Sequence, residues 1–164
     1  MTAIHASAVL VGAQAVLVRG VSGSGKSRLA LRLIEAAVLG SLPFARLVSD
    51  DRTHIYVLHG RLIARPPAAL AGLMEVRGLG IRQVPYEPMA VVGLVVDLAM
   101  EDAQRMPEDA ALQVEFEGVT LPRLAFPSCA DPLPVLLAAL RPGLGERMTA
   151  DGLALRCSIT VNEH

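Results

Sequence analysis

The chain is poor in aromatic residues and cysteine, and neither sign of charge dominates it. It has 164 residues, no tryptophan, 3% aromatic residues and a formal net charge of −1. Nucleic-acid-binding proteins usually present a basic face or a row of stacking aromatics, so this composition argues against a nucleic-acid partner. The two cysteines, Cys129 and Cys157, lack metal-site or redox-motif spacing. We therefore expect two small buried residues in a reducing cytoplasm.

No apolar run is long enough to cross a membrane. The longest, from Ala90 to Val96, stops at Asp97, whereas a transmembrane helix needs about 20 apolar residues. The hydrophobic share of 52% and the mean hydropathy of +0.47 are nevertheless high. A subunit interface would absorb this excess, so we expect a homo-oligomer with no membrane association.

Short strands and few helices are predicted along the chain. Two apolar segments around Gly12 predict a β-hairpin, and further hairpins are predicted to turn at 59–60 and at Gly118. From Lys26 the apolar residues follow helical spacing up to a stop at Gly40. We therefore expect one α/β domain over residues 1–164, with a mixed β-sheet flanked by helices. The other expected elements are strands over 45–51 and 91–98 and a short helix over 131–143. The apolar face of the long helix is expected to contain Ala30, Leu33, Ile34, Ala37 and Val38.

The segment GVSGSGKS matches the phosphate-binding pattern G-x-x-x-x-G-K-[ST]. Its glycines accept backbone angles that allow several amides to converge on one anion. The helix that begins there adds unpaired N–H groups and the positive end of its dipole. Lys26 can reach the terminal phosphates, and the Ser27 hydroxyl can bind Mg²⁺. The pattern predicts nucleotide binding but leaves the reaction open, because ATPases, GTPases and kinases share it. The predicted nucleotide-binding residues are Gly20, Val21, Ser22, Gly23, Ser24, Gly25, Lys26 and Ser27.

A pair of acids ends the predicted strand LVSDD. Neighbouring residues of a strand face opposite ways, so one of Asp50 and Asp51 can reach a metal ion while the other orients a different group. In this pattern the two acids are candidates for Mg²⁺ binding and for accepting a proton in phosphoryl transfer.

The segment GLMEVRGLGI contains a further acid. Glu75 and Arg77 lie two residues apart, so on an extended strand both would point to one face. Gly78 and Gly80 would then allow another backbone or a ligand to approach closely.

With the motifs HAS, GVSGSGKS, LVSDD and LMEVRGLGI in this order, the chain resembles the catalytic domain of bacterial HPr kinase/phosphorylases, from about residue 5 to about residue 141. The resemblance implies a P-loop fold of the HPr kinase and phosphoenolpyruvate carboxykinase type, assembled as a hexamer. It also implies a cytoplasmic, ATP- and Mg²⁺-dependent kinase that phosphorylates a serine of HPr, the phosphocarrier protein of the phosphotransferase system.

The resemblance implies roles for individual residues. The implied metal ligands are Ser27 and Glu75, and the implied proton acceptor is Asp51, with Asp50 beside it. The residues implied to take part in catalysis are His5, Lys26, Asp50, Asp51 and Arg105.

Two features depart from the family pattern. His5 is almost the first residue, so we expect a short form with the catalytic domain only, without regulation that depends on the N-terminal domain of longer members. In the family, reverse phosphorolysis is linked to a segment rich in arginine and glycine, but here TLPRLAFPSCADPLP holds one arginine, Arg123, and no glycine. The motifs support the kinase reaction and leave phosphorolysis open. A small-molecule kinase and a nucleotide-sensing module without chemistry are the alternative functions.

Overall fold

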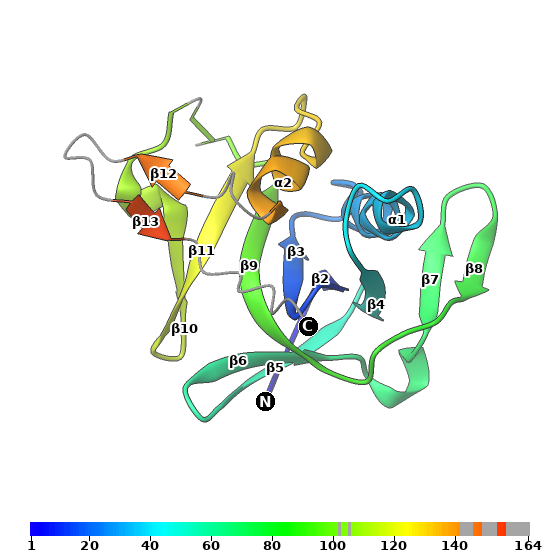
Figure 1. Cartoon of the computed structure of the whole chain (residues 1–164). Coiled ribbons are helices and arrows are strands. Elements are labelled where there is room, and N and C mark those ends of the chain that lie inside the picture. The colour runs from blue at the N-terminus through cyan, green and yellow to red at the C-terminus, as the bar shows by residue number, and fades with distance from the viewer. Residues whose placement is uncertain (102, 105, 142–145, 149–153, 157–164) are drawn as a thin grey trace.

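The described part of the chain is a bent mixed β-sheet with α1 and α2 on one of its faces (Figure 1). The computed structural model describes residues 1–101, 103–104, 106–141, 146–148 and 154–156. The helices are α1 (Lys26–Val38), η1 (Ala68–Leu70), η2 (Asp109–Leu112) and α2 (Leu133–Leu140). The strands are β1 (Thr2–Ile4), β2 (Ala6–Val11), β3 (Gln14–Arg19), β4 (Ala45–Ser49), β5 (Thr53–Leu58), β6 (Arg61–Arg65), β7 (Leu73–Val76), β8 (Gly80–Gln83), β9 (Ala90–Leu98), β10 (Gln113–Phe116), β11 (Val119–Phe126), β12 (Glu146–Met148) and β13 (Ala154–Arg156).

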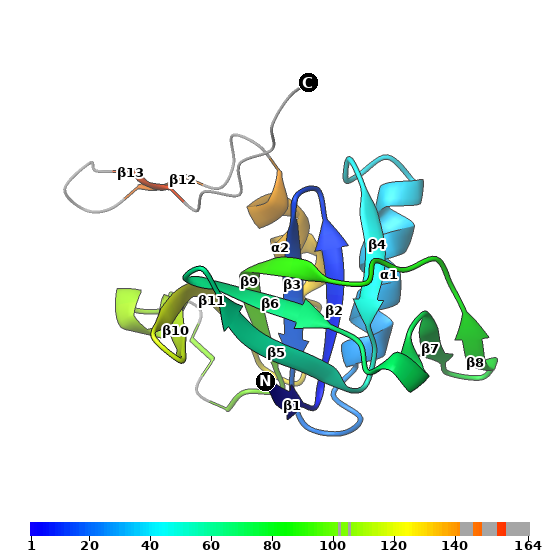
Figure 2. The same cartoon turned by 90° about the horizontal axis from the view of Figure 1, so that it is seen from below.

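Among the described residues, the main sheet has nine strands in the order β1-β5-β6-β9-β3-β2-β4, with β11 also beside β9 and β10 beside β11. β9 is parallel to β3 and to β11, while β2 is antiparallel to both β3 and β4. The start of β9 pairs with β6 and its end pairs with β11. The sheet therefore bends along β9, and the β5–β6 hairpin crosses the face of β2 and β3 (Figure 2). The predicted mixed sheet and its hairpins are confirmed.

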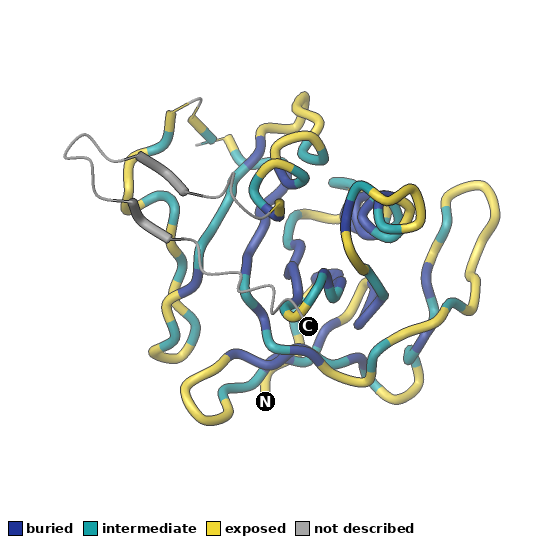
Figure 3. The backbone as a smooth tube through the Cα atoms, viewed as in Figure 1, coloured by how far each residue is buried: buried dark blue, intermediate teal, exposed yellow. Residues whose placement is uncertain are grey.

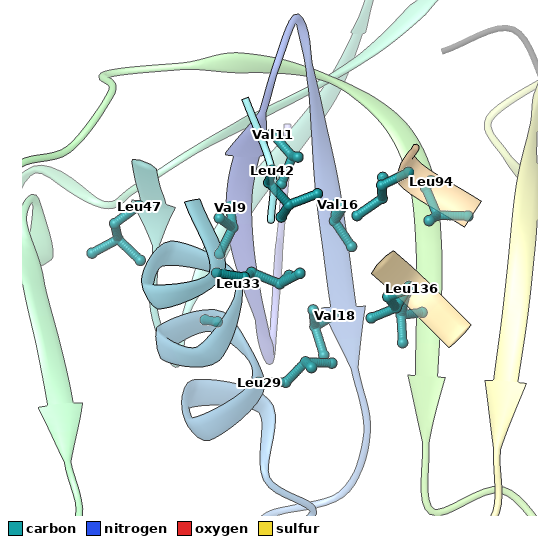
Figure 4. Close-up of a cluster of buried hydrophobic side chains, with 14 of the residues drawn as sticks. Val9, Val11, Val16, Val18, Leu29, Leu33, Leu42, Leu47, Leu94 and Leu136 are labelled. Carbon is teal, nitrogen blue, oxygen red and sulfur yellow. The ribbon is translucent and has the colours of Figure 1, made fainter. Parts of the chain in front are cut away.

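Two apolar clusters lie on the two faces of β2, β3 and β9. One lies under α1 and α2, and the other lies between the sheet and the β5–β6 hairpin. In the first cluster, Leu29 and Leu33 of α1 lie against sheet residues such as Val9 and Val18 (Figure 4). Burying each such side chain stabilises the fold by about 1.5–3 kcal/mol. The buried strands run through the centre of the molecule, and the hairpin tips are exposed (Figure 3).

Most of the predicted helix face is confirmed, but Val38 is 82% exposed. It is the last residue of α1, and Gly40 turns the chain away with φ 75°, so Val38 has no neighbouring element to cover it. The expectation of two buried cysteines is also wrong, because Cys129 lies exposed in the connection from β11 to α2. Cys157 lies outside the described residues. No helix in the described ranges has the length and apolar character that crossing a bilayer requires.

Candidate functional site

The predicted phosphate-binding loop joins the end of β3 to the start of α1. Gly25 precedes the helix with φ 96°, in the left-handed region that residues with a Cβ rarely adopt. A Cβ at Gly20 would lie 3.0 Å from the Leu98 carbonyl oxygen and 2.5 Å from Ser24 Oγ. The loop therefore needs glycine at Gly25 for its backbone angle and at Gly20 for its contact with the end of β9.

Lys26 is a buried cation at the mouth of this loop. Its Nζ donates hydrogen bonds to the carbonyl oxygens of Gly20, at 2.9 Å, and Val21, at 3.0 Å. Burial lowers the pKa of Lys26, while the charges of Asp51 and Asp50 oppose that shift. The ammonium group is thus held by the loop's own backbone, within the space that a phosphate chain would enter.

Asp50 is a buried carboxylate that ties four elements together. Ser7 Oγ of β2 and Ser27 Oγ of α1 donate to its Oδ1, at 2.6 Å and 2.8 Å. The backbone N–H of Glu75 in β7 donates to its Oδ2 at 3.1 Å. Because Asp50 follows β4 directly, these bonds fix the end of β4 against the first turn of α1 and against β7.

Asp51 points away from Asp50 into solvent. Asp51 has φ 60°, and the Arg52 N–H donates to the Asp50 carbonyl oxygen at 2.7 Å, which closes a tight turn around Asp51. His5, between β1 and β2, lies 2.9 Å from Asp51, measured from Nε2 to Oδ1. A carboxylate can only accept this bond, so His5 Nε2–H donates it. The two acids face different ways, as predicted, although a turn and not strand alternation separates them.

The hairpin β7–β8 corrects one prediction. The strand β7 ends at Val76, so Arg77 lies in the turn and does not share a strand face with Glu75. Gly78 and Gly80 have φ 86° and 76°, and a Cβ at either would meet nothing within 4 Å. These glycines therefore serve the turn within this chain, and the approach of a ligand or another backbone to them stays a prediction. The Glu75 side chain is exposed, although its N–H holds the hairpin against Asp50.

The described residues contain all but one of the predicted site residues. Arg105 lies outside the described residues. His5, Asp50, Asp51 and Glu75 lie around the loop, between β1 and β2, after β4 and on β7, whereas Arg77, Gly78 and Gly80 lie in the β7–β8 turn and at the start of β8. Hydrogen bonds link His5 with Asp51, Lys26 with the loop, and Ser27 and Glu75 with Asp50.

A charge cluster that the sequence did not predict spans three adjacent strands around the buried Asp97. Asp97 of β9 accepts two hydrogen bonds from Arg19 of β3, both at 2.7 Å, and one from Arg123 Nε of β11 at 2.6 Å. Burial alone would raise the pKa of Asp97, but the bonds and charges of Arg19 and Arg123 outweigh it and hold that pKa below its ordinary value. The only sequence signal was an acid that ends an apolar run.

Replacing Asp97 with asparagine is expected to lower the free energy of unfolding by about 3 kcal/mol at pH 7, because two arginines lose their shared carboxylate. The pKa of Asp97 is lower in the folded chain, so its contribution is complete above the ordinary value of 3.8 and is lost as pH falls below it. Urea unfolding of both proteins at pH 7 and at about pH 3 measures this difference. A difference that does not shrink at the lower pH would contradict the assignment.

The oxygens near Ser27 suit a magnesium ion bound together with phosphates. Ser27 Oγ and Asp50 Oδ1 lie 2.8 Å apart at the start of the helix. No group of three or more His, Cys, Asp or Glu side chains in the described ranges forms a metal site. One hydroxyl and one carboxylate are donors that suit Mg²⁺, because this ion keeps several waters and takes few protein ligands besides the substrate phosphates.

Comparisons with known proteins match this site and fold. The model of the family "HPr Serine kinase C-terminal domain" matches residues 1–125. The HPr kinase/phosphorylase of Clostridium tetani is 42% identical over 136 residues, which cover 74% of this chain and 42% of that protein. The HPr kinase/phosphorylase of Streptococcus thermophilus is 32% identical over 137 residues, with 77% and 42% covered.

A solved structure, the HPr(Ser) kinase/phosphatase from Coxiella burnetii, superposes with a TM-score of 0.67 at 26% identity, covering 85% of this chain and 93% of that one. The chain spans less than half of the length of the curated relatives, 42% in both cases.

Proposed function

We propose that this chain, which belongs to the HPr serine kinase C-terminal domain family, transfers the γ-phosphoryl group of ATP to a serine of the phosphocarrier protein HPr. One observation carries the proposal: the phosphate-binding loop holds Lys26 at its mouth, and Asp50 of the adjoining acid pair bonds to Ser27 of that loop. The exposed member of the pair, Asp51, is open to an incoming hydroxyl. The names of the relatives favour HPr as the protein that supplies this hydroxyl.

The loop would position the phosphates. When ATP binds, Lys26 Nζ would exchange its two carbonyl partners for the β- and γ-phosphates, and the backbone amides of residues 20–27 would surround them. This exchange requires little movement, because Nζ already lies at the loop mouth. It also reverses the effect of burial on the pKa of Lys26, since a phosphate favours the charged ammonium.

Asp51 would accept the proton of the serine hydroxyl as the oxygen attacks the γ-phosphorus. Its carboxylate is exposed, and His5 Nε2–H orients it through the bond at 2.9 Å. The other member of the acid pair is buried and already accepts hydrogen bonds from Ser7, Ser27 and the Glu75 N–H, so Asp50 is better suited to holding the site than to taking a proton.

A bound Mg²⁺ neutralises charge on the transferring phosphates. Ser27 and the adjacent Asp50 would hold it, with the exposed carboxylate of Glu75 as a further ligand. We also propose that Arg105 contributes to the site, that the chain works in the cytoplasm, and that it assembles with further copies of itself.

The arginine of the segment linked to phosphorolysis is already engaged. Arg123 donates to Asp97 through Nε and to the Ala111 carbonyl oxygen through Nη1 at 3.2 Å. With its guanidinium bound in this way, Arg123 is poorly placed to bind the inorganic phosphate that reverse phosphorolysis needs. We therefore expect the forward transfer to dominate.

The test is to incubate the protein with ATP, Mg²⁺ and the cognate HPr and to map any phosphate by mass spectrometry. The expected result is one phosphorylated serine on HPr, absent when that serine is replaced by alanine. ATP binding without any transfer would favour a nucleotide sensor, and transfer to a metabolite from a parallel panel would favour a small-molecule kinase. Excess inorganic phosphate added afterwards tests reversal, which we expect to be slow.

A further inference from the structure

A second concave site adjoins the phosphate-binding loop on the side away from the acid pair. This cavity has a volume of about 330 Å³ and lies between α1 and the connection from β11 to α2. Ser24 and Gly25 of the loop form one end of it, and Leu29 of α1 and Leu98 at the end of β9 contribute apolar surface. The lining from the connection is residues 127–132.

We propose that this cavity binds the nucleoside end of the nucleotide, an inference that rests on the proposed kinase function. Its volume of about 330 Å³ is at the small end of the range for ligand pockets, about 300–1,000 Å³. This volume suits one nucleoside better than the surface of a partner protein. The loop residues Ser24 and Gly25 are shared between the cavity and the phosphate site. A ligand whose phosphates occupy the loop can therefore extend into the cavity without leaving the protein surface.

The order of the strands supports this direction. β9 and β11 lie on one side of β3, while β2 and β4 lie on the other. The cavity is built from the residues that follow β9 and β11, and the acid pair follows β4. In-line phosphoryl transfer needs the leaving group and the attacking oxygen on opposite sides of the phosphorus. An acceptor at Asp51 therefore places the nucleoside on the cavity side.

The cavity has the chemistry for a planar base and a ribose. Leu29 and Leu98 offer apolar contact, and Arg28 also lines the cavity, so its guanidinium is available to stack on a ring. The far wall is fixed by Arg32, which donates to both carboxylate oxygens of Asp131 at 2.6 Å and 3.0 Å. This pair links the connection to α1 beside the cavity.

A thiol at the rim provides a direct readout. Cys129 is exposed and lines the cavity. In a Cys157→Ser background, where only Cys129 can react, saturating ATP is expected to slow alkylation at least about tenfold, whereas inorganic triphosphate, which reaches only the loop, slows it less than about twofold. Equal protection by both would show that the nucleoside does not enter the cavity and would overturn the inference.

A cavity-filling variant tests the same point without the cysteine. Ala130→Trp places an indole in the lining. This variant is expected to lower the affinity for ATP at least about tenfold while changing the affinity for inorganic triphosphate less than about twofold. The matched control is Ala138→Trp, at an exposed position of α2 outside the lining, which should leave both affinities unchanged. Equal ATP affinity in the two folded variants overturns the inference.

The outcomes separate this inference from the kinase function. If the unmodified chain phosphorylates HPr but ATP gives no protection and Ala130→Trp binds ATP normally, the cavity assignment fails and the kinase function stands. If ATP does not bind at all by calorimetry, both fail.

Discussion

Replacing Lys26 with alanine is expected to reduce phosphoryl transfer to HPr at least about 10³-fold, because the developing charge on the phosphates loses its nearest fixed cation. Nζ lies at the loop mouth, bonded to the carbonyl oxygens of Gly20 and Val21 at 2.9 Å and 3.0 Å. The initial rate of phospho-HPr formation at saturating ATP and Mg²⁺ measures the effect.

The control for this variant is Lys26→Met, which keeps a long unbranched side chain in the buried position but removes the charge. Both variants should lose transfer to the same extent and retain a cooperative thermal transition. Loss in Lys26→Ala with activity in Lys26→Met would show that packing, and not charge, is what the loop needs. A Lys26→Ala rate within about tenfold of the parent would remove the loop from the transfer site altogether.

The loop and the helix after it could be predicted because their signals are local. The residue types at Gly25 and Lys26 are dictated by backbone angle and charge within one short segment, although Gly20 also approaches the Leu98 carbonyl oxygen at the end of β9. The stop of α1 near Gly40 follows from a single residue with positive φ. Such features depend on few distant contacts, so the sequence pattern could predict them.

The hairpin β7–β8 shows where local reasoning failed. Periodicity placed Glu75 and Arg77 on one strand face, but the strand ends between them at Val76. The glycines that follow have positive φ and form the turn. The same residues are compatible with a longer strand or a tighter turn, and only the packing of the hairpin against Asp50 decides between them.

The charge cluster at Asp97 could not be predicted because it depends on strands far apart in the chain. Arg19 and Asp97 are 78 residues apart in sequence, and Asp97 and Arg123 are 26 apart. They meet only because β3, β9 and β11 are parallel neighbours. Nothing in the sequence around Asp97 identifies its partners, whereas the identity of the acid pair Asp50 and Asp51 was visible from the strand that precedes it.

The two acids after β4 have different roles in the proposed site because their surroundings differ. Asp50 is buried and accepts bonds from Ser7, Ser27 and the Glu75 N–H, so its carboxylate is committed to holding the loop, helix and hairpin together. Asp51 is carried outward by its positive φ and has His5 as its hydrogen-bond partner. Positive φ in a residue other than glycine costs free energy, and such residues cluster at active sites, although His59 and Glu117 also adopt it in hairpin turns.

Asp51→Asn is therefore expected to lower the rate of phosphoryl transfer at saturating ATP by about 10² or more, while changing ATP affinity less than about threefold. Asparagine has nearly the same shape, and its Oδ1 can still accept the bond from His5 Nε2–H, so the geometry is kept while the ability to take a proton is lost. Single-turnover measurements of phospho-HPr formation, beside calorimetric titration of ATP, separate the two quantities.

The matched control is Glu115→Gln, which neutralises an exposed carboxylate on β10, a strand on the far side of β11 and β9 from the acid pair. This variant should transfer at the parent rate, so that a loss in Asp51→Asn reports the position of the carboxylate and not the net charge of the chain. Equal losses in both variants would indicate long-range attraction of HPr. A normal rate in Asp51→Asn would mean that the loop's positioning of the phosphates suffices and that the serine proton leaves by another route.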